Sequence, residues 1–179
     1  MSVDIVAMIG NLSQSLIPVQ ALIKGLGYLL GLIFMMTAVG KLKKIGDARS
    51  SGGSHEKMFI PIAYFMGGTM LIFLPSAITA FSTTAFGVAN TDWGYSNYNP
   101  YNIYSAMRVV IRTAGLIWFV RGCVLLVHAS EPGVQHGPKG LAFLCAGVLA
   151  INFEGTVAVV NVIIEKLILL SQYSTNIKG

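Results

Sequence analysis

The sequence predicts an all-α integral membrane bundle of four transmembrane helices, preceded by a short N-terminal amphipathic helix. The mean hydropathy is +0.69, and only 11% of the 179 residues are charged, whereas soluble domains usually carry about 25%. The chain also contains four apolar stretches of about 20 residues, the length that crosses a bilayer as a helix. We therefore expect a single membrane domain that covers residues 1–179.

The four expected spans comprise residues 21–40, 58–80, 106–127 and 140–164. Residues 1–17 precede them, and their helical spacing of apolar residues is typical of an amphipathic helix at the membrane surface or along the bundle. Pro18 is expected to end this helix, and Pro75 to kink or end the second span. Residues 165–179 are expected to form the tail, in which the helix can run on through Glu165 and Lys166 to Leu170 and residues 171–179 are polar.

The third span organises the prediction because it carries three arginines. Arg108 and Arg112 share one helical face, and Arg121 lies roughly 20 Å further along the helix. A charge inside a bilayer is costly, so these side chains should face protein, water or headgroups. Glu154 is the acid that lies well inside the fourth span, and we predict that it pairs with Arg112. Lys24 is the alternative partner. A pair that sets helix register is favoured over a proton or ion path, because one acid is few for a relay.

The distribution of basic residues predicts the orientation. Residues 41–57 hold five of the twelve Lys and Arg residues, whereas the tyrosine-rich segment 82–105 holds none. Short basic loops stay in the cytoplasm, so we expect the loop 41–57 to be cytoplasmic and both termini to be periplasmic. The net charge of +5 belongs to residues that flank apolar spans, which argues against direct binding of nucleic acid.

Small residues predict where helices approach closely. Gly27 and Gly31 are four residues apart in the first span, and this spacing leaves one helical face bare enough for another helix. Cys123 and Cys145 both fall inside expected spans, where cysteine usually behaves as a small apolar residue.

No motif of a known active site is present. The sequence contains no GxxxxGK[ST], HExxH, GxSxG or CxxC pattern. His128, Glu131 and His136 offer three metal-ligating side chains, but their irregular spacing in a Gly/Pro loop favours a solvated loop. We therefore expect no enzyme activity, no catalytic residue, no cofactor and no metal site.

Two segments of the chain resemble a known family, NLSQSLIPVQALIKGLGYLLGLIFMMTAVGKLKKIGD and KMFIPIAYFMGGTMLIFLPS. They resemble the small inner-membrane proteins of type IVB secretion systems known as IcmC or DotE, with DotV and the conjugal transfer protein TraQ as relatives. The resemblance covers most of residues 11–80 and, more loosely, the later spans. It implies a multi-pass protein of the bacterial inner membrane in an apparatus that moves effector proteins or DNA, and it implies no reaction.

Two functions remain in competition at this point. The first is a structural subunit of a type IVB secretion (Dot/Icm-like) or conjugation apparatus, with membrane lipid and other inner-membrane subunits as partners and with self-association left open. The second is a small ion or solute channel or transporter that uses Glu154 and the intramembrane arginines. Copurification of a defined set of proteins would favour the first, and flux through the purified protein alone would favour the second.

Overall fold

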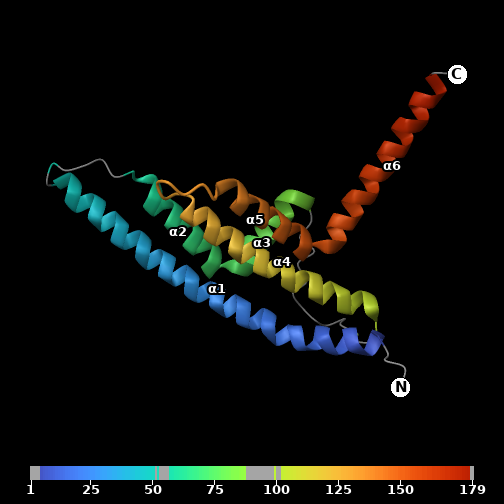
Figure 1. Ribbon diagram of the computed structural model, residues 1–179, viewed down its shortest axis with the longest axis horizontal. Coiled ribbons are helices and arrows are strands. Elements are labelled where there is room, and N and C mark those ends of the chain that lie inside the picture. The colour runs from blue at the N-terminus through green and yellow to red at the C-terminus, as the bar shows by residue number, and fades with distance from the viewer. Residues whose placement is uncertain (1–4, 51, 53–56, 88–98, 100–101, 178–179) are drawn as a thin grey trace.

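The computed structural model is all-α, as the sequence predicts (Figure 1). It describes residues 5–50, 52, 57–87, 99 and 102–177, with the backbone alone for residues 174–177. Within these residues six helices follow one another: α1 Ile5–Ser50, α2 Phe59–Ile72, α3 Leu74–Phe86, α4 Ile103–His128, α5 Gly137–Ile151 and α6 Phe153–Ile177. Most of the tyrosine-rich segment 82–105 and the middle of the loop 41–57 lie outside the described residues.

The helices identify a membrane protein with two to four candidate spans. Of the described helices, α1 and α4 are each long and apolar enough to cross a bilayer. The pairs α2–α3 and α5–α6 meet the same criterion only when each bent pair is taken as one span. The bounds of α4 agree closely with the expected span 106–127.

The N-terminal part of the prediction is wrong, because α1 is one continuous helix of 46 residues with Pro18 inside it. At 1.5 Å per residue its length is about 69 Å, more than twice the thickness of the hydrocarbon core. Proline is tolerated within membrane helices where neighbouring groups satisfy the freed backbone. Beyond the predicted span, Ile45 is buried, so packing keeps residues 41–50 helical where a loop was expected.

The second and fourth predicted spans are each interrupted by a sharp bend. The axes of α2 and α3 meet at 97° around Phe73, and those of α5 and α6 meet at 95° around Asn152. Pro75 lies in the first turn of α3, so the kink expected from this proline is confirmed. The bend at Asn152 was not predicted. The helix does run on past Ile164, and it extends beyond Leu170 to Ile177 where a polar tail was expected.

The long helices cross the short ones at glycines. A Cβ atom placed on Gly31 of α1 would lie 2.8 Å from the carbonyl oxygen of Gly68 in α2. A Cβ atom on Gly115 of α4 would lie 3.0 Å from the carbonyl oxygen of Gly147 in α5. These distances leave no room for a side chain, so the backbones of each pair are in direct contact.

The helices α1 and α4 run side by side in the same direction, with both starts at the lower right of Figure 1. Near these starts the buried side chain of Gln20 donates from Nε2 to Thr113 Oγ1 at 2.7 Å and to the carbonyl oxygen of Val109 at 3.4 Å. Since both long helices run the same way, the chain must return from the end of α1 to the start of α4. The bent pair α2–α3 lies between them in the sequence, which supports its assignment as one membrane span.

Candidate functional site

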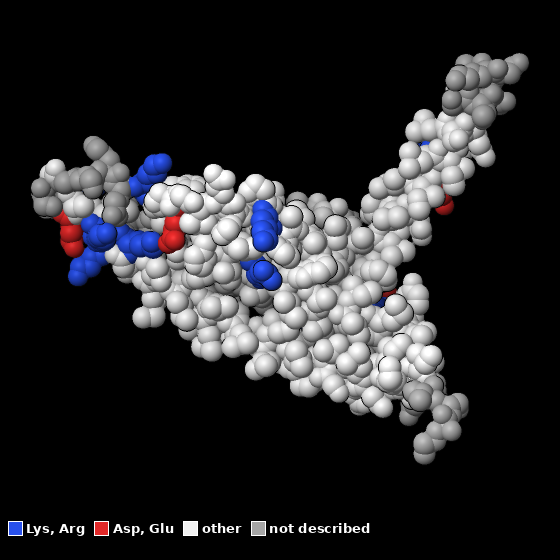
Figure 2. Space-filling model, viewed as in Figure 1, with Lys and Arg blue, Asp and Glu red and all other residues white. Residues whose placement is uncertain are grey.

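Basic side chains gather at one end of the bundle, where the end of α1 meets the start of α2 (Figure 2). Lys41, Lys44 and Lys57 line a cavity of about 380 Å³ at this end. The other walls of the cavity are apolar and consist of Ile45, Ile60, Pro61 and Pro132. Ammonium groups above apolar walls suit the boundary between lipid headgroups and hydrocarbon.

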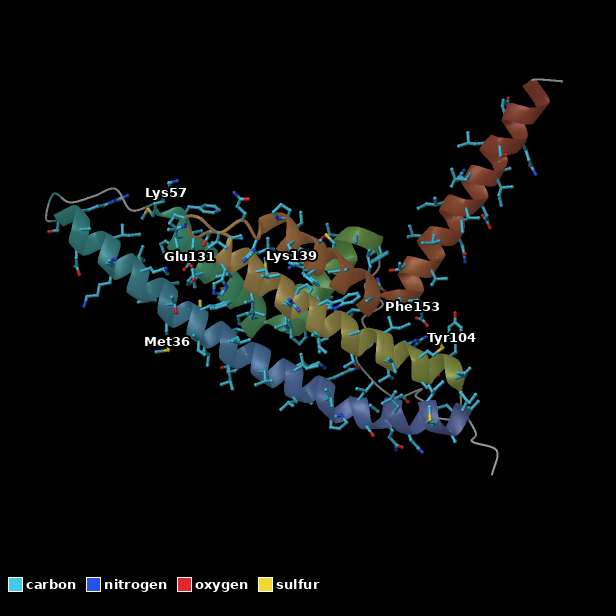
Figure 3. The ribbon with its side chains drawn as sticks, in the orientation of Figure 1. Met36, Lys57, Tyr104, Glu131, Lys139 and Phe153 are labelled. Carbon is cyan, nitrogen blue, oxygen red and sulfur yellow. The ribbon has the colours of Figure 1, made fainter. Side chains whose placement is uncertain are left out.

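Glu131 joins three segments of the chain beside this cavity (Figure 3). Its Oε1 atom accepts a hydrogen bond from the Tyr64 hydroxyl at 2.6 Å and lies 3.2 Å from Lys41 Nζ. Lys41 comes from α1, Tyr64 from α2, and Glu131 from the turn after α4. The Tyr64 hydroxyl, and then the Lys41 ammonium, lower the pKa of Glu131 below its ordinary value because both stabilise the carboxylate.

Three aromatic rings pack together next to the Glu131 contact. The rings of Phe34, Tyr64 and His128 meet edge to face, with centroids 5.6 to 6.2 Å apart. His128 Nδ1 lies 2.8 Å from the carbonyl oxygen of Val124, so this nitrogen donates its proton to the backbone. Lys41 Nζ also lies 4.9 Å from the centre of the Tyr64 ring.

The arrangement around Glu131 is suited to fastening helices together. The carboxylate is held by the Tyr64 hydroxyl and the Lys41 ammonium group. His128 uses its Nδ1 atom for a hydrogen bond within α4. Glu131 therefore has its partners in Tyr64 and Lys41, whereas the sequence offered it with His128 and His136 as a candidate metal ligand. In the described part of the chain no three His, Cys, Asp or Glu side chains lie close enough to hold a metal ion.

The structure gives Glu154 an ion pair with Arg108. Arg108 lies one helical turn before Arg112 on α4, and Glu154 lies in the first turn of α6, next to the bend. Negative charge is favourable at this end of a helix because of the helix dipole. The predicted pair of Glu154 with Arg112 stays a prediction, and the ion pair with Arg108 shows that the arginine face of α4 does reach this acid.

The two glycines singled out from the sequence both lie against neighbouring helices. A Cβ atom on Gly27 would meet Leu74 of α3 at 3.4 Å and Val120 of α4 at 3.9 Å. Gly31 faces the backbone of α2 more closely, at 2.8 Å. Cys123 is buried, Cys145 is exposed, and both are free thiols.

The helix α6 leaves the bundle, and Phe153 marks its base in Figure 3. Its apolar side chains from Val159 to Leu170 are exposed on every side of the helix. Three polar residues, Asn161, Glu165 and Lys166, interrupt this apolar surface and are exposed as well.

Sequence reasoning missed the contact of Glu131 with Tyr64 and Lys41, and it missed the isolation of α6. Tyr64 stands in a span without any charge, so the pattern gave it no partner. The signal for α6 was present in the segment 157–170, whose mostly apolar residues continue past the expected end of the fourth span.

Comparison with known proteins adds no family: no family model, no curated protein and no solved structure matches the chain.

Proposed function

We propose that this protein is a structural subunit of a multi-protein assembly in a bacterial inner membrane. The observation that carries the proposal is α6, a helix of 25 residues whose apolar side chains from Val159 to Leu170 are exposed around its whole circumference. A subunit that is complete by itself would fold such a helix against its own bundle. A helix that projects from the bundle is available to other membrane proteins.

The polar residues of α6 strengthen this argument. Asn161, Glu165 and Lys166 interrupt an apolar surface, and polar or charged groups that face hydrocarbon are costly. Neighbouring helices lower this cost by offering hydrogen bonds and opposite charges. The composition of α6 therefore favours contact with protein over contact with lipid alone.

The resemblance to the IcmC/DotE family makes a type IVB secretion or conjugation apparatus the proposed assembly. In this proposal the lysine-rich end of the bundle faces the cytoplasm and the termini lie in the periplasm, as the positive-inside rule expects. The role is the positioning of other subunits during translocation of effector proteins or DNA, without a reaction of its own.

The alternative of an ion or solute channel finds less support. Its main acidic candidate, Glu154, is engaged in an ion pair with Arg108. A carboxylate held in this way is better suited to fixing the bend between α5 and α6 than to passing protons.

Copurification tests the proposal. The tagged protein should be isolated from its native membrane in mild detergent, and its partners should be identified and quantified by mass spectrometry. We expect partners in a fixed ratio, and we expect Asn161→Leu to reduce their recovery at an unchanged level of the tagged protein. Gln172→Leu, which changes another exposed polar residue of α6, is the matched control and should retain the partners.

Two results would contradict the proposal. One is a tagged protein that is recovered without a stoichiometric partner in both the wild type and the control. The other is ion flux through the pure protein in liposomes that Glu154→Gln abolishes, which would establish the channel.

A further inference from the structure

The chain divides into two three-helix units of similar plan. The first unit is α1–α2–α3 and the second is α4–α5–α6, each with a long helix, a short helix and a bent continuation. The bends are 97° and 95°. The residues at the bends, Phe73 and Asn152, have nearly the same backbone angles, with φ of −98° and −100° and ψ of 41° and 50°. Each donates its N–H to the carbonyl of the residue four positions earlier.

The crossing of long and short helix is also the same in both units. Gly31 meets Gly68 in the first unit, and Gly115 meets Gly147 in the second. When the two units are aligned on these glycines, GLIF at 31–34 and GLIW at 115–118 share three of four residues. The segments IAYFMGGTMLI at 62–72 and LAFLCAGVLAI at 141–151 share three of eleven, and most of the other positions are apolar in both. In each unit the second glycine stands five residues before the bend. Corresponding residues of the two units can therefore be assigned one by one.

Within the chain, the bent helix of the first unit packs on the second unit. The helix α3 contacts α5, and its Phe81 ring lies 5.8 Å from the Phe119 ring of α4. On the second unit, Leu144 is 5% exposed and Asn152 is 3% exposed. The second unit is thus buried at the corner between its short helix and its bend, and α3 is one of the helices that contact its short helix α5.

The corresponding corner of the first unit is open. Phe65, which corresponds to Leu144, is 52% exposed, and Phe73, which corresponds to Asn152, is 60% exposed. These residues belong to an apolar groove of about 450 Å³ that is also lined by Met66, Thr69, Met70 and Ala77. The helix that corresponds to α3 is α6, whose apolar side chains from Val159 to Leu170 are exposed.

We propose that α6 of one copy docks in the groove of a second copy, with the contacts that α3 makes on the second unit of its own chain. The open groove and the isolated helix are then the two halves of one interface. This proposal names the partner of α6 and rests on the proposed role of α6 in assembly.

The outer face of α1 fits the same arrangement. The helix α4 faces the first unit with Thr113, Leu116 and Val120, which are all buried or half-buried. The corresponding residues of α1 are Leu29, Leu32 and Met36, and all three are exposed and apolar. Met36 points away from the bundle in Figure 3.

The interface that follows is head to tail, because the end of one copy meets the beginning of the next. Such heterologous contacts generate closed rings or open filaments, in contrast to symmetric dimers.

The repeat predicts one contact between copies in particular. The contact of Phe81 with Phe119 inside the chain corresponds to a contact of Val160 with Met35 of the next copy. Met35 is half-buried, and its sulfur atom lies 3.9 Å from the Thr69 hydroxyl at the groove. Val160 is exposed on α6.

Disulfide cross-linking between two differently tagged copies tests this contact. One copy carries Val160→Cys and the other carries Met35→Cys, both in a Cys123→Ala, Cys145→Ala background, and both are expressed together at levels checked by their tags. We expect oxidation to yield a species that carries both tags, at about twice the mass of the 19.1 kDa chain. Because each copy has one cysteine, this product cannot arise within a chain.

Val162→Cys is the matched control, since it is exposed on α6 but faces nearly the opposite direction. A cross-link from position 160 at least several-fold stronger than from 162 supports the interface. Equal cross-linking from both positions, or none from position 160, overturns it.

Thr69→Trp gives a second measurement without new cysteines. Filling the groove should lower the oligomer mass in detergent, and an unchanged oligomer would also refute the docking. If partners copurify in the proposed way while position 160 does not cross-link, the role as a subunit stands and the second copy is excluded.

Discussion

Replacing Gly147 by alanine should destabilise the crossing of α4 and α5 more than any similar change on a lipid-facing surface. A Cβ atom at this position would lie 2.7 Å from the backbone nitrogen of Phe119 and 2.9 Å from the carbonyl oxygen of Gly115. Both neighbours are backbone atoms of α4, so no side chain can rotate away. To reach an ordinary contact of 3.4 Å, the helices would have to separate by about 0.7 Å.

The size of the effect follows from this separation. A gap of roughly 0.5–1 Å removes a quarter to a half of the dispersion attraction between the facing atoms, and overpacked sites usually lose about 1–3 kcal/mol. For a chain of this length, such a loss lowers the midpoint of thermal unfolding by roughly 2–12 °C. Gly68→Ala should cost less, because its nearest neighbours are 3.0 Å away and include the flexible side chain of Met35.

The assay is thermal unfolding of the purified protein in one detergent at a fixed scan rate, followed by tryptophan fluorescence. Gly25→Ala is the control, because a Cβ atom there meets nothing within 4 Å and alanine favours the helix by up to about 1 kcal/mol. We expect Gly25→Ala to leave the midpoint unchanged or raise it. A midpoint for Gly147→Ala at or above that of the wild type would refute the close crossing.

Three further outcomes are expected. Arg108→Ala and Glu154→Ala should each lower stability in detergent, and the double variant should recover part of the loss with a coupling of about 0.5–3 kcal/mol; coupling of Glu154 to Arg112 alone would reverse the assignment. Because the pKa of Glu131 is lower in the folded state, its contacts stabilise the fold above the unfolded pKa and are lost as pH falls through the folded one. The stability of Glu131→Gln should thus vary less with acid pH than the wild type does, and equal curves would show that its contacts are weak. A cysteine at Gly52 should resist an impermeant reagent in intact spheroplasts, and ready labelling would invert the orientation.

The sequence predicted the features that depend on local composition. The all-α class and the extent of α4 follow from the length of apolar stretches, and the kink near Pro75 follows from the missing N–H of proline. The close approach at Gly31 follows from the small size of glycine at helical spacing. Each of these properties is decided by a few neighbouring residues.

The features that the sequence did not reveal depend on contacts between distant residues. The continuous helix α1 makes contacts with distant segments on both sides of the expected span, through Gln20 to Thr113 on α4 and through Lys41 to Glu131 in the turn after α4. The partner of Glu131 is a tyrosine 67 positions away. No pattern along the chain contains this information, because it arises only when α1, α2 and α4 pack together.

The two bends show why the similarity of the two units was not predicted from the sequence. Around Phe73 the chain breaks with the help of Pro75, whereas around Asn152 no proline is present. There the Thr156 hydroxyl donates to the carbonyl oxygen of Leu149 at 2.8 Å and so satisfies a group that the end of α5 would leave open. A Cβ atom placed on Gly155 would lie 3.0 Å from the Asn152 side chain. Glycine at this position therefore avoids a tight contact inside the bend. Different residues thus produce the same bend, and what the two units share is the position of the glycine crossing five residues earlier. The two bends have the same consequence for the next helix, because one directs α3 onto the second unit and the other directs α6 away from the bundle.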